Sequence, residues 1–300
     1  MIRRLRQLGL RRSEWVCVAF FFYIAGLAPF FPNRPMLRFQ PFLVALAVFA
    51  FLLIMLRLEV GKWAQIINHF RDWLPTALTL TAFQEMELFL PRRFPHHYEA
   101  IWIKQDYTLL QTWHLQKAVE SLGAVIPFYL EFCYLLVYGF PFYCVGILYS
   151  RGLRKFVDIF FVIYLAGTLG AYALFPFFPS QPPRLLYPDV AMPHITSWVR
   201  HFNLFILSKA TIHVGVFPSA HVSSAFSAAW AMFLIQPRKK VLGWALTLYA
   251  VSVSAATIYG RYHYTADVLA GIGVSVVTGL LCTVTLQRCL RSLQCPNKRC

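Results

Sequence analysis

Long apolar runs recur along the whole chain, and they constrain its fold more than any other feature of the sequence. A helix of about 18 residues rises about 27 Å, close to the thickness of the hydrocarbon core of a bilayer. Only helices and closed barrels satisfy their backbone groups inside lipid, and these runs lack the alternating pattern of barrel strands. The sequence therefore predicts an all-α, polytopic membrane bundle of about eight transmembrane helices. The expected crossings are residues 15–31, 41–58, 73–90, 127–149, 156–178, 219–236, 241–258 and 264–287.

The charge of the chain is unevenly distributed. Only 13% of the residues are charged, about half the share of a soluble domain, yet the formal net charge is +16. Lys and Arg gather in segments that alternate between crossings, as the positive-inside rule requires of cytoplasmic loops. These segments are 1–14, 57–72, 150–155, 237–240 and 288–300. We therefore expect both termini in the cytoplasm and an anionic membrane surface, with no nucleic acid, as the partner of the basic residues.

The crossings divide the chain into three expected parts. Residues 1–72 form an N-terminal transmembrane hairpin and a cytoplasmic amphipathic segment, 73–287 a six-helix core, and 288–300 a basic cytoplasmic tail. Two long outer segments, 91–126 and 179–218, interrupt the core. Within the second, apolar residues at helical spacing predict a helix over 195–207, with Arg200 and Asn203 outside its apolar stripe. This helix either lies in the membrane interface or caps the bundle.

Two histidines are predicted to meet at one membrane face. His221 begins one apolar run and His263 follows the next, and a basic turn joins two legs of equal length between them. A hairpin of equal legs returns the chain to the depth at which it started. Two imidazoles at one depth can share the duties of nucleophile and acid in phosphoryl transfer. The alternative is that the two side chains are unconnected.

The surroundings of each histidine suggest a role. Asp267 lies four residues after His263, which on one helix face allows a carboxylate to orient the ring for attack on phosphorus and a phosphohistidine product. His221 follows Pro218 and the possible helix cap Ser219, at a helix start that suits a phosphate oxygen. His221 would protonate the leaving oxygen. Structural capping and a helix-end hydrogen bond are the alternative explanations.

Three further charged residues are candidates for the same site. Arg184 follows a proline-rich segment and Arg261 precedes His263 by two residues, so both are expected to hold phosphate oxygens together with Ser219. Glu131 lies inside the fourth crossing and needs a partner, for which Arg184 and Arg261 are the expected choices; a carboxylate that reaches outer water is the alternative. The remaining histidines show no compact metal-ligand spacing, so we expect neither a metal nor a cofactor.

These residues resemble the type 2 phosphatidic acid phosphatase superfamily. Its second motif is similar to Pro218-Ser219-Ala220-His221, and the HxxxD core of its third motif is similar to His263–Asp267. The resemblance covers roughly residues 73–287. It implies that His263 is the nucleophile, that Asp267 orients it, and that His221 is the acid for the leaving group in a metal-independent reaction.

Details around the motifs resemble one branch of that superfamily. Thr257 stands where the third motif usually has an arginine, and Leu185 follows Arg184 where the first motif has a proline. The stretch from Thr257 to Tyr264, together with Pro182-Pro183-Arg184, is similar to the inositol phosphorylceramide synthases, and residues 259–268 are similar to the sphingomyelin synthases. In those branches the acceptor is a lipid or polyol hydroxyl.

The sequence thus predicts a membrane lipid phosphotransferase that works through a phosphohistidine at the outer membrane face. It would move a phosphoryl group or a phospho-headgroup, with phosphoinositol among the candidates, from a phospholipid or lipid phosphate to a lipid hydroxyl. One alternative is a phosphatase that hydrolyses phosphatidic acid or an isoprenoid diphosphate. Another is a lipid-binding or transport protein without enzymatic activity, which would carry charged or broken helices at the bilayer midplane.

Overall fold

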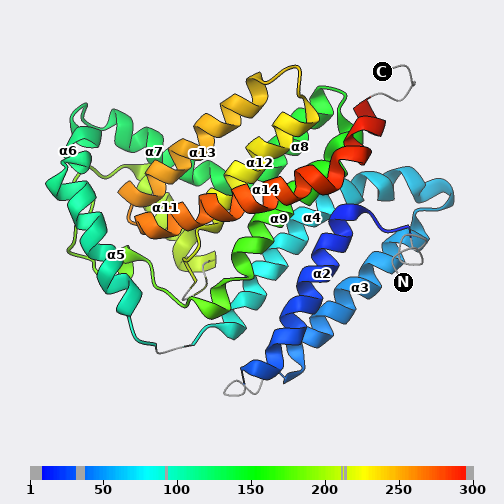
Figure 1. The fold of residues 1–300 in the computed structure, drawn as a ribbon, viewed down its shortest axis with the longest axis horizontal. Coiled ribbons are helices and arrows are strands. Elements are labelled where there is room, and N and C mark those ends of the chain that lie inside the picture. Colours follow the sequence, from blue (N-terminus) through cyan, green and yellow to red (C-terminus); the bar gives the residue numbers. More distant parts are fainter. Residues whose placement is uncertain (1–8, 32–37, 92–93, 211, 213–214, 295–300) are drawn as a thin grey trace.

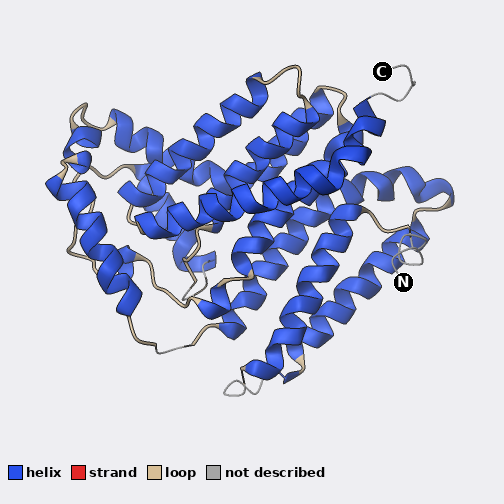
Figure 2. Ribbon diagram, viewed as in Figure 1, coloured by secondary structure: helices blue, strands red, loops and turns tan. Residues whose placement is uncertain are grey.

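The computed structural model describes residues 9–31, 38–91, 94–210, 212 and 215–294. Helices and short connections make up all of this part of the chain, which contains no strand (Figure 2). The all-α prediction is therefore confirmed. The α-helices are α2 (Arg12–Leu27), α3 (Gln40–Leu58), α4 (Ala64–Met86), α5 (His97–Tyr107), α6 (Leu115–Glu120), α7 (Val125–Leu136), α8 (Phe140–Ser150), α9 (Val157–Tyr172), α10 (Pro183–Leu186), α11 (Trp198–Ala210), α12 (Ala220–Ile235), α13 (Val241–Tyr259) and α14 (Thr265–Gln294).

Six helical stretches in the described part of the chain are long and apolar enough to cross a membrane, so the protein is a multi-pass integral membrane protein. They correspond to six of the eight expected crossings. The other two expected crossings, 219–236 and 73–90, correspond to helices that fail on different grounds. Helix α12 is apolar but has only 16 residues, whereas α4 is long enough but more polar. The six stretches are 12–30, 40–58, 125–150, 154–177, 241–259 and 265–294.

Helix α9 forms the centre of the bundle. Helices α2, α4, α12 and α14 all pack on it, and α12 lies between α9, α13 and α14 (Figure 1). Small residues allow this close packing: Gly167 of α9 leaves room for the side chain of Ser227, and alanine and serine fill most of the buried face of α12. Inside a bilayer, where water does not drive association, such close contact between helices supplies the packing energy.

The basic segments gather at one end of the bundle, which we call the basic end. Asp72 binds Arg11 and Arg154 there, with N–O distances of 2.6 and 2.7 Å. The Lys155 ammonium donates to the carbonyl of Leu293, which brings the end of α14 to the same place. The grouping predicted from charge is therefore present in the fold, and the histidines lie at the opposite ends of α12 and α13.

A buried ion pair joins the N-terminal hairpin to the core. Arg71 of α4 binds Glu14 of α2 at 2.6 Å, and it also binds Glu59. Helix α4 begins at Ala64 and runs without a break past residue 72. The expected domain boundary at 72/73 thus falls inside one helix, and the expected amphipathic segment is its first part. Residues 288–294 of the expected tail continue α14, and residues 295–300 lie outside the described part of the chain.

The outer segments cover the histidine end of the bundle. Helices α5 and α6 lie at the edge far from α2 and α3 (Figure 1), and α11 packs on α7. The predicted helix over 195–207 is observed as α11, but its orientation differs from that of a helix in a soluble protein. Trp198, Phe202 and Phe205 are exposed, whereas Arg200 and Asn203 are buried. The helix thus presents three aromatic residues outward and turns Arg200 and Asn203 to the protein.

Candidate active site

The structure brings His221 and His263 into contact. His221 lies in the first turn of α12, and His263 lies in the turn between α13 and α14. The Nδ1 atom of His221 is 3.3 Å from the Nε2 atom of His263, which is hydrogen-bond distance. His263 is almost completely buried. The two helices of the expected hairpin have 16 and 19 residues rather than equal lengths, and the two rings nevertheless meet directly.

Asp267 orients the His263 ring. Its Oδ2 atom is 3.3 Å from His263 Nδ1, and the same oxygen accepts the backbone N–H of Tyr264 at 2.8 Å. The carboxylate is therefore fixed at the start of α14, where the helix N-terminus favours negative charge. With Nδ1 turned toward Asp267, the Nε2 atom of His263 faces His221. This is the nitrogen that is free to attack an electrophile.

Ser219 connects the two motifs through its backbone. It caps α12, with its Oγ atom accepting the N–H of Val222 at 3.4 Å, as its position in the sequence indicates. Its own N–H donates to the carbonyl of Asp267 at 2.9 Å. The start of α12, which carries His221, is thereby attached to the start of α14, which carries Asp267.

Gly271 permits this close approach of two helices. A Cβ atom at this position would lie 2.5 Å from the carbonyl oxygen of Ser219, closer than nonbonded atoms come. Gly273, two residues further along α14, has nothing within 4 Å of the same point. The absence of a side chain at Gly271 is therefore a local requirement of the site and not a general property of α14.

Arg184 supplies positive charge beside the histidines. Its backbone N–H donates to the carbonyl of Arg261 at 3.2 Å, and its guanidinium lies 5.6 Å from the centre of the Tyr262 ring. No carboxylate in the described part of the chain forms an ion pair with it. Burial lowers the pKa of Arg184. Burial, and then the charge of Arg184, lower the pKa of His263 to about 3. At neutral pH the site thus holds a neutral imidazole next to an unpaired cation, an arrangement that suits an anion.

Arg261 occupies a different environment. Its Nη1 atom binds Asp106 of α5 at 2.6 Å, and the other oxygen of Asp106 accepts the N–H of Thr265 at 3.0 Å. The Arg261 side chain is completely buried, and its Nε and Nη2 atoms have no hydrogen-bond partner among the described residues. These two nitrogens are the donors that remain for a phosphate, so phosphate binding by Arg261 stays a prediction.

The prediction that Arg184 or Arg261 is the partner of Glu131 was wrong. Glu131 is buried, and its carboxylate binds Arg200 at 2.6 Å rather than Arg184 or Arg261. The Nδ2 atom of Asn203 and the hydroxyl of Tyr262 also donate to this carboxylate, at 2.8 and 2.6 Å. A buried carboxylate is stable when charge and hydrogen bonds compensate its lost hydration, and all three donors do so here.

This cluster supports the turn that carries His263. Arg200 also donates to the carbonyl of Gly260, at 3.2 Å from Nη1 and 3.3 Å from Nη2. Tyr262 stacks on Tyr134 of α7 at 3.9 Å between ring centres. Helices α7 and α11 therefore hold both sides of the turn that precedes the candidate nucleophile.

Sequence reasoning missed Arg200, Asn203 and Asp106. The first two seemed to lie on a polar outer surface, and Asp106 lies in an outer segment whose fold had not been predicted. It also missed Tyr134 and Tyr138, whose ring centres lie 5.3 and 5.7 Å from that of His221. For Arg200 and Asn203 the available signal was a charged or amide residue within an aromatic helix of a membrane protein, because such a residue turns away from hydrocarbon.

No group of three or more His, Cys, Asp or Glu residues in the described part of the chain has the arrangement of a metal site.

The fold and the site together define a multi-pass helical membrane protein with a buried pair of histidines, one of them oriented by a carboxylate. Comparison with known proteins places it more narrowly. Residues 105–281 match the family model described as the PAP2 superfamily, and the chain belongs to this superfamily. All the site residues discussed above lie within the matched range.

A PA-phosphatase related-family protein of Dictyostelium discoideum is similar to part of the chain. The two are 36% identical over 128 residues, which is 41% of this chain and 21% of that protein. The matched region thus spans about a fifth of the length of the curated relative. No solved structure matches the chain.

Proposed function

We propose that the protein is a membrane lipid phosphotransferase that works through a phosphohistidine on His263. The observation that carries the proposal is the row of contacts from Asp267 through His263 to His221, with the unpaired Arg184 beside it. A nucleophile next to a base, with a third group orienting the ring, is the arrangement on which nucleophilic catalysis relies. Membership of the PAP2 superfamily supports phosphorus as the electrophile.

The reaction has two steps in this proposal. The Nε2 atom of His263 attacks phosphorus, the bond from phosphorus to the leaving alkoxide breaks, and His221 gives that oxygen a proton. His221 has to carry this proton as the imidazolium when the step begins, and the negative charge of the bound phosphate favours that form. His221 then accepts the proton of an incoming hydroxyl, whose oxygen forms a bond to phosphorus as the P–N bond breaks. Arg184, and Arg261 through its two unpartnered nitrogens, would hold the equatorial oxygens.

The resting structure requires one movement before this reaction. The two ring nitrogens are in direct contact at 3.3 Å, so a phosphoryl group has to enter between them. We propose that the rings rotate apart when an anionic substrate binds, which replaces the contact between the imidazoles by contacts to phosphate oxygens. Rotation of the two side chains makes this room without movement of the helices, because the hydrogen bond from Ser219 to Asp267 keeps the starts of α12 and α14 together.

Burial of the site supports transfer to a lipid hydroxyl as the main reaction. His263 is 5% exposed and Asp267 is completely buried. A phosphohistidine that water reaches is hydrolysed, so exclusion of water favours a bound acceptor. The resemblance of residues 257–264 to transferases points in the same direction. Hydrolysis of phosphatidic acid or an isoprenoid diphosphate is the second candidate, and the name of the Dictyostelium relative favours it.

Product analysis tests the proposed function. Purified protein in lipid nanodiscs would receive labelled phosphatidic acid or phosphatidylinositol, with and without ceramide or diacylglycerol, beside a His263→Ala control. A new labelled phospholipid that forms only with the wild type supports transfer and identifies the acceptor. Labelled free phosphate from phosphatidic acid supports the phosphatase. No labelled product with any pair contradicts both proposals for these substrates.

The contact at Gly271 predicts a selective loss of activity. Gly271→Ala should lower kcat/KM by about 10²-fold, because a shift of about 1 Å between Ser219 and α14 would separate His221 from His263. The measurement is steady-state turnover in nanodiscs, with thermal unfolding alongside. Gly273→Ala is the matched control and should keep wild-type turnover. Equal activity of the two variants would show that the close approach is not needed.

The low pKa of His263 predicts the pH dependence of turnover. Its pKa lies below the ordinary value near 6.5, so the nucleophile stays neutral down to about pH 3, and the acid limb of kcat/KM should lie well below pH 6.5. Arg184→Gln removes a repelling charge and should move this limb to higher pH, while Arg184→Lys should move it less. Profiles of kcat/KM from pH 3 to 8 check this, and the limb belongs to the coupled histidine pair. The same midpoint for the wild type and Arg184→Gln would contradict the proposed influence of Arg184.

The same pKa shift has a consequence for stability. Folding lowers the pKa of His263, so below about pH 6.5 the unfolded chain binds a proton that the folded chain does not. The free energy of unfolding that depends on a neutral His263 is therefore lost progressively as the pH falls from about 6.5 toward 3. Thermal unfolding in the same pH series separates loss of fold from loss of the nucleophile.

A further inference from the structure

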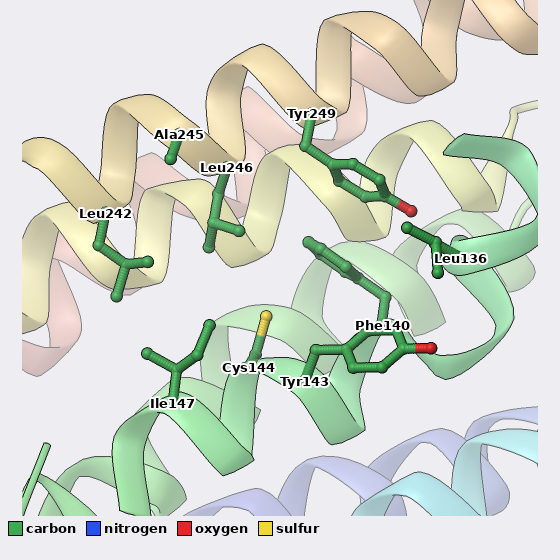
Figure 3. A pocket seen from close by; sticks show the side chains of 9 residues that line it. All are labelled: Leu136, Phe140, Tyr143, Cys144, Ile147, Leu242, Ala245, Leu246 and Tyr249. Carbon is green, nitrogen blue, oxygen red and sulfur yellow. The ribbon is translucent and has the colours of Figure 1, made fainter. Parts of the chain in front are cut away.

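An apolar groove lies between α8 and α13 (Figure 3). Its volume is about 270 Å³. Phe140 and Cys144 form one wall and Leu242, Leu246 and Tyr249 the other, with Leu136 at one end. All of these residues belong to stretches that are long and apolar enough to cross the membrane. The groove is therefore at the depth of the hydrocarbon core.

The sequence explains why the groove opens at this place. Pro141 occupies the first turn of α8, and the preceding residues 137–139 form a 3-10 turn between α7 and α8. Proline has no N–H with which to continue the hydrogen bonding of a preceding helix, so it fits the first turn of a new one. Helix α7 packs along α13, whereas α8 makes no comparable contact with it. The space between α8 and α13 therefore opens where α7 ends and α8 begins.

The groove offers no hydroxyl group to a polar ligand. The hydroxyl of Tyr249 already donates to the carbonyl of Cys133 at 2.9 Å. The hydroxyl of Tyr143, the other polar group of the lining, lies against Gly139, 3.0 Å from the point where a Cβ would be. It points away from the groove (Figure 3). An occupant at this depth therefore meets carbon atoms and one thiol, which suits a hydrocarbon chain.

The upper end of the groove lies on the side of the histidine pair, and the rings of Phe140 and Tyr249 stack across it at 4.7 Å between centres. Leu136 and Phe140 line this end, and Tyr138, which lies between them in sequence, contacts the ring of His221 at 5.7 Å between centres. From Tyr249 to Leu242 the groove follows α13 for about 10 Å toward the basic end. A lipid whose phosphate lies at His221 and His263 would reach the groove by extending a long chain past Tyr138 and this aromatic pair.

We propose that this groove binds a hydrocarbon chain of the lipid that reacts at the histidine pair, an inference that rests on the proposed function. A chain that leaves the bilayer for a protein groove gains little hydrophobic free energy, because both surroundings are apolar. The groove would therefore position the lipid rather than increase its affinity. It fixes the path of the hydrocarbon chain, and the path of the chain fixes the position of the phosphate. Chain length, rather than headgroup affinity alone, should then control turnover.

Two phenylalanine substitutions on α13 test this. Ala245 lines the groove, so Ala245→Phe should fill it, whereas Leu248, which is exposed on the same helix and does not line the groove, provides the matched control Leu248→Phe. With a long-chain phosphatidic acid, Ala245→Phe should lower kcat/KM about tenfold or more through misplacement of the phosphate. With dihexanoyl phosphatidic acid, whose chains are too short to fill the groove, the variant should match the wild type. Equal behaviour of the two variants with both lipids would overturn the proposal.

A second measurement distinguishes failure of the groove proposal from failure of the proposed function. His263→Ala in nanodiscs would receive phosphatidic acid with a photoreactive diazirine at the chain end, or phosphatidylcholine with the same chain. Preferential labelling of residues 140–147 and 242–249 by phosphatidic acid supports the proposal, whether or not the wild type turns this lipid over. Equal labelling by both lipids would show that bulk bilayer lipid fills the groove, and the proposal would fall. Absence of turnover by the wild type with every lipid would instead contradict the proposed function.

Discussion

Replacing His263 with alanine is expected to lower kcat for the lipid phosphate substrate by about 10⁴-fold or more, while the fold remains intact. The reason is that Nε2 of His263 forms the bond to phosphorus in the proposed mechanism, and that Asp267 orients this imidazole and not that of His221. The side chain makes few contacts that hold the bundle together, since the turn is supported through Tyr262 and Gly260. Turnover in nanodiscs and thermal unfolding measure the two effects separately.

A chemical trap makes this prediction sharper. Wild-type protein quenched with alkali during turnover should carry acid-labile label from the donor phosphate, and mass spectrometry should locate it on His263. His263→Ala should carry none. The exposed His201 on α11 offers a control, since His201→Ala should keep both label and turnover. A labelled His263→Ala protein, or one that keeps more than a few per cent of wild-type activity, would refute the role of this residue.

His221→Gln should have the second largest effect, a loss of about 10²- to 10⁴-fold in kcat. His221 gives a proton to the leaving alkoxide in the proposed first step, and an alkoxide is a poor leaving group without it. The loss should therefore depend on the leaving group. A nitrophenyl phosphate ester, whose leaving group needs no proton, should show a much smaller loss in the first step than a lipid ester.

The second step gives an independent measure of the same variant. Without His221 to activate the incoming hydroxyl, the phosphohistidine should accumulate, so His221→Gln given the nitrophenyl ester should carry more label on His263 than the wild type does. Rapid quenching at early times measures this. A loss of equal size for both leaving groups, with no accumulated label, would indicate that His221 only shapes the site.

The parts of the structure that follow from local pattern were predictable from the sequence. Crossing helices depend on long apolar runs, and the meeting of His221 with His263 follows from two successive helices of similar length, 16 and 19 residues. The cap at Ser219 follows from a serine placed between a proline and an apolar run. None of these features requires knowledge of how distant segments pack.

The partner of Glu131 was not predictable in the same way. In a water-soluble helix an apolar stripe faces the core, and on that assumption Arg200 and Asn203 would lie outside. In α11 the relation differs, because Trp198, Phe202 and Phe205 are exposed while Arg200 and Asn203 are buried against the protein. Periodicity identifies the two faces of such a helix but does not tell which of them is buried.

The environment of Arg261 shows a second limit. Its partner Asp106 lies 155 positions earlier in the chain, in the outer segment 91–126. Nearness to His263 in sequence suggested a side chain directed at the substrate, whereas one edge of its guanidinium binds α5. Only the tertiary arrangement of the outer segments decides how many of its donors are left for a ligand.

The ion pair between Glu14 and Arg71 limits how far the chain can be shortened. The family match begins at residue 105, which suggests a minimal catalytic fragment without the first hairpin. Such a fragment would lose α2, so any α4 that it kept would carry Arg71 without its buried carboxylate, and one side of α9 would lose its covering helix. Removal of one partner from a buried pair costs about 3–5 kcal/mol, a large share of the stability of a folded domain. The buried pair of Glu14 and Arg71 therefore sets a limit on truncation that the range of the family match does not reveal.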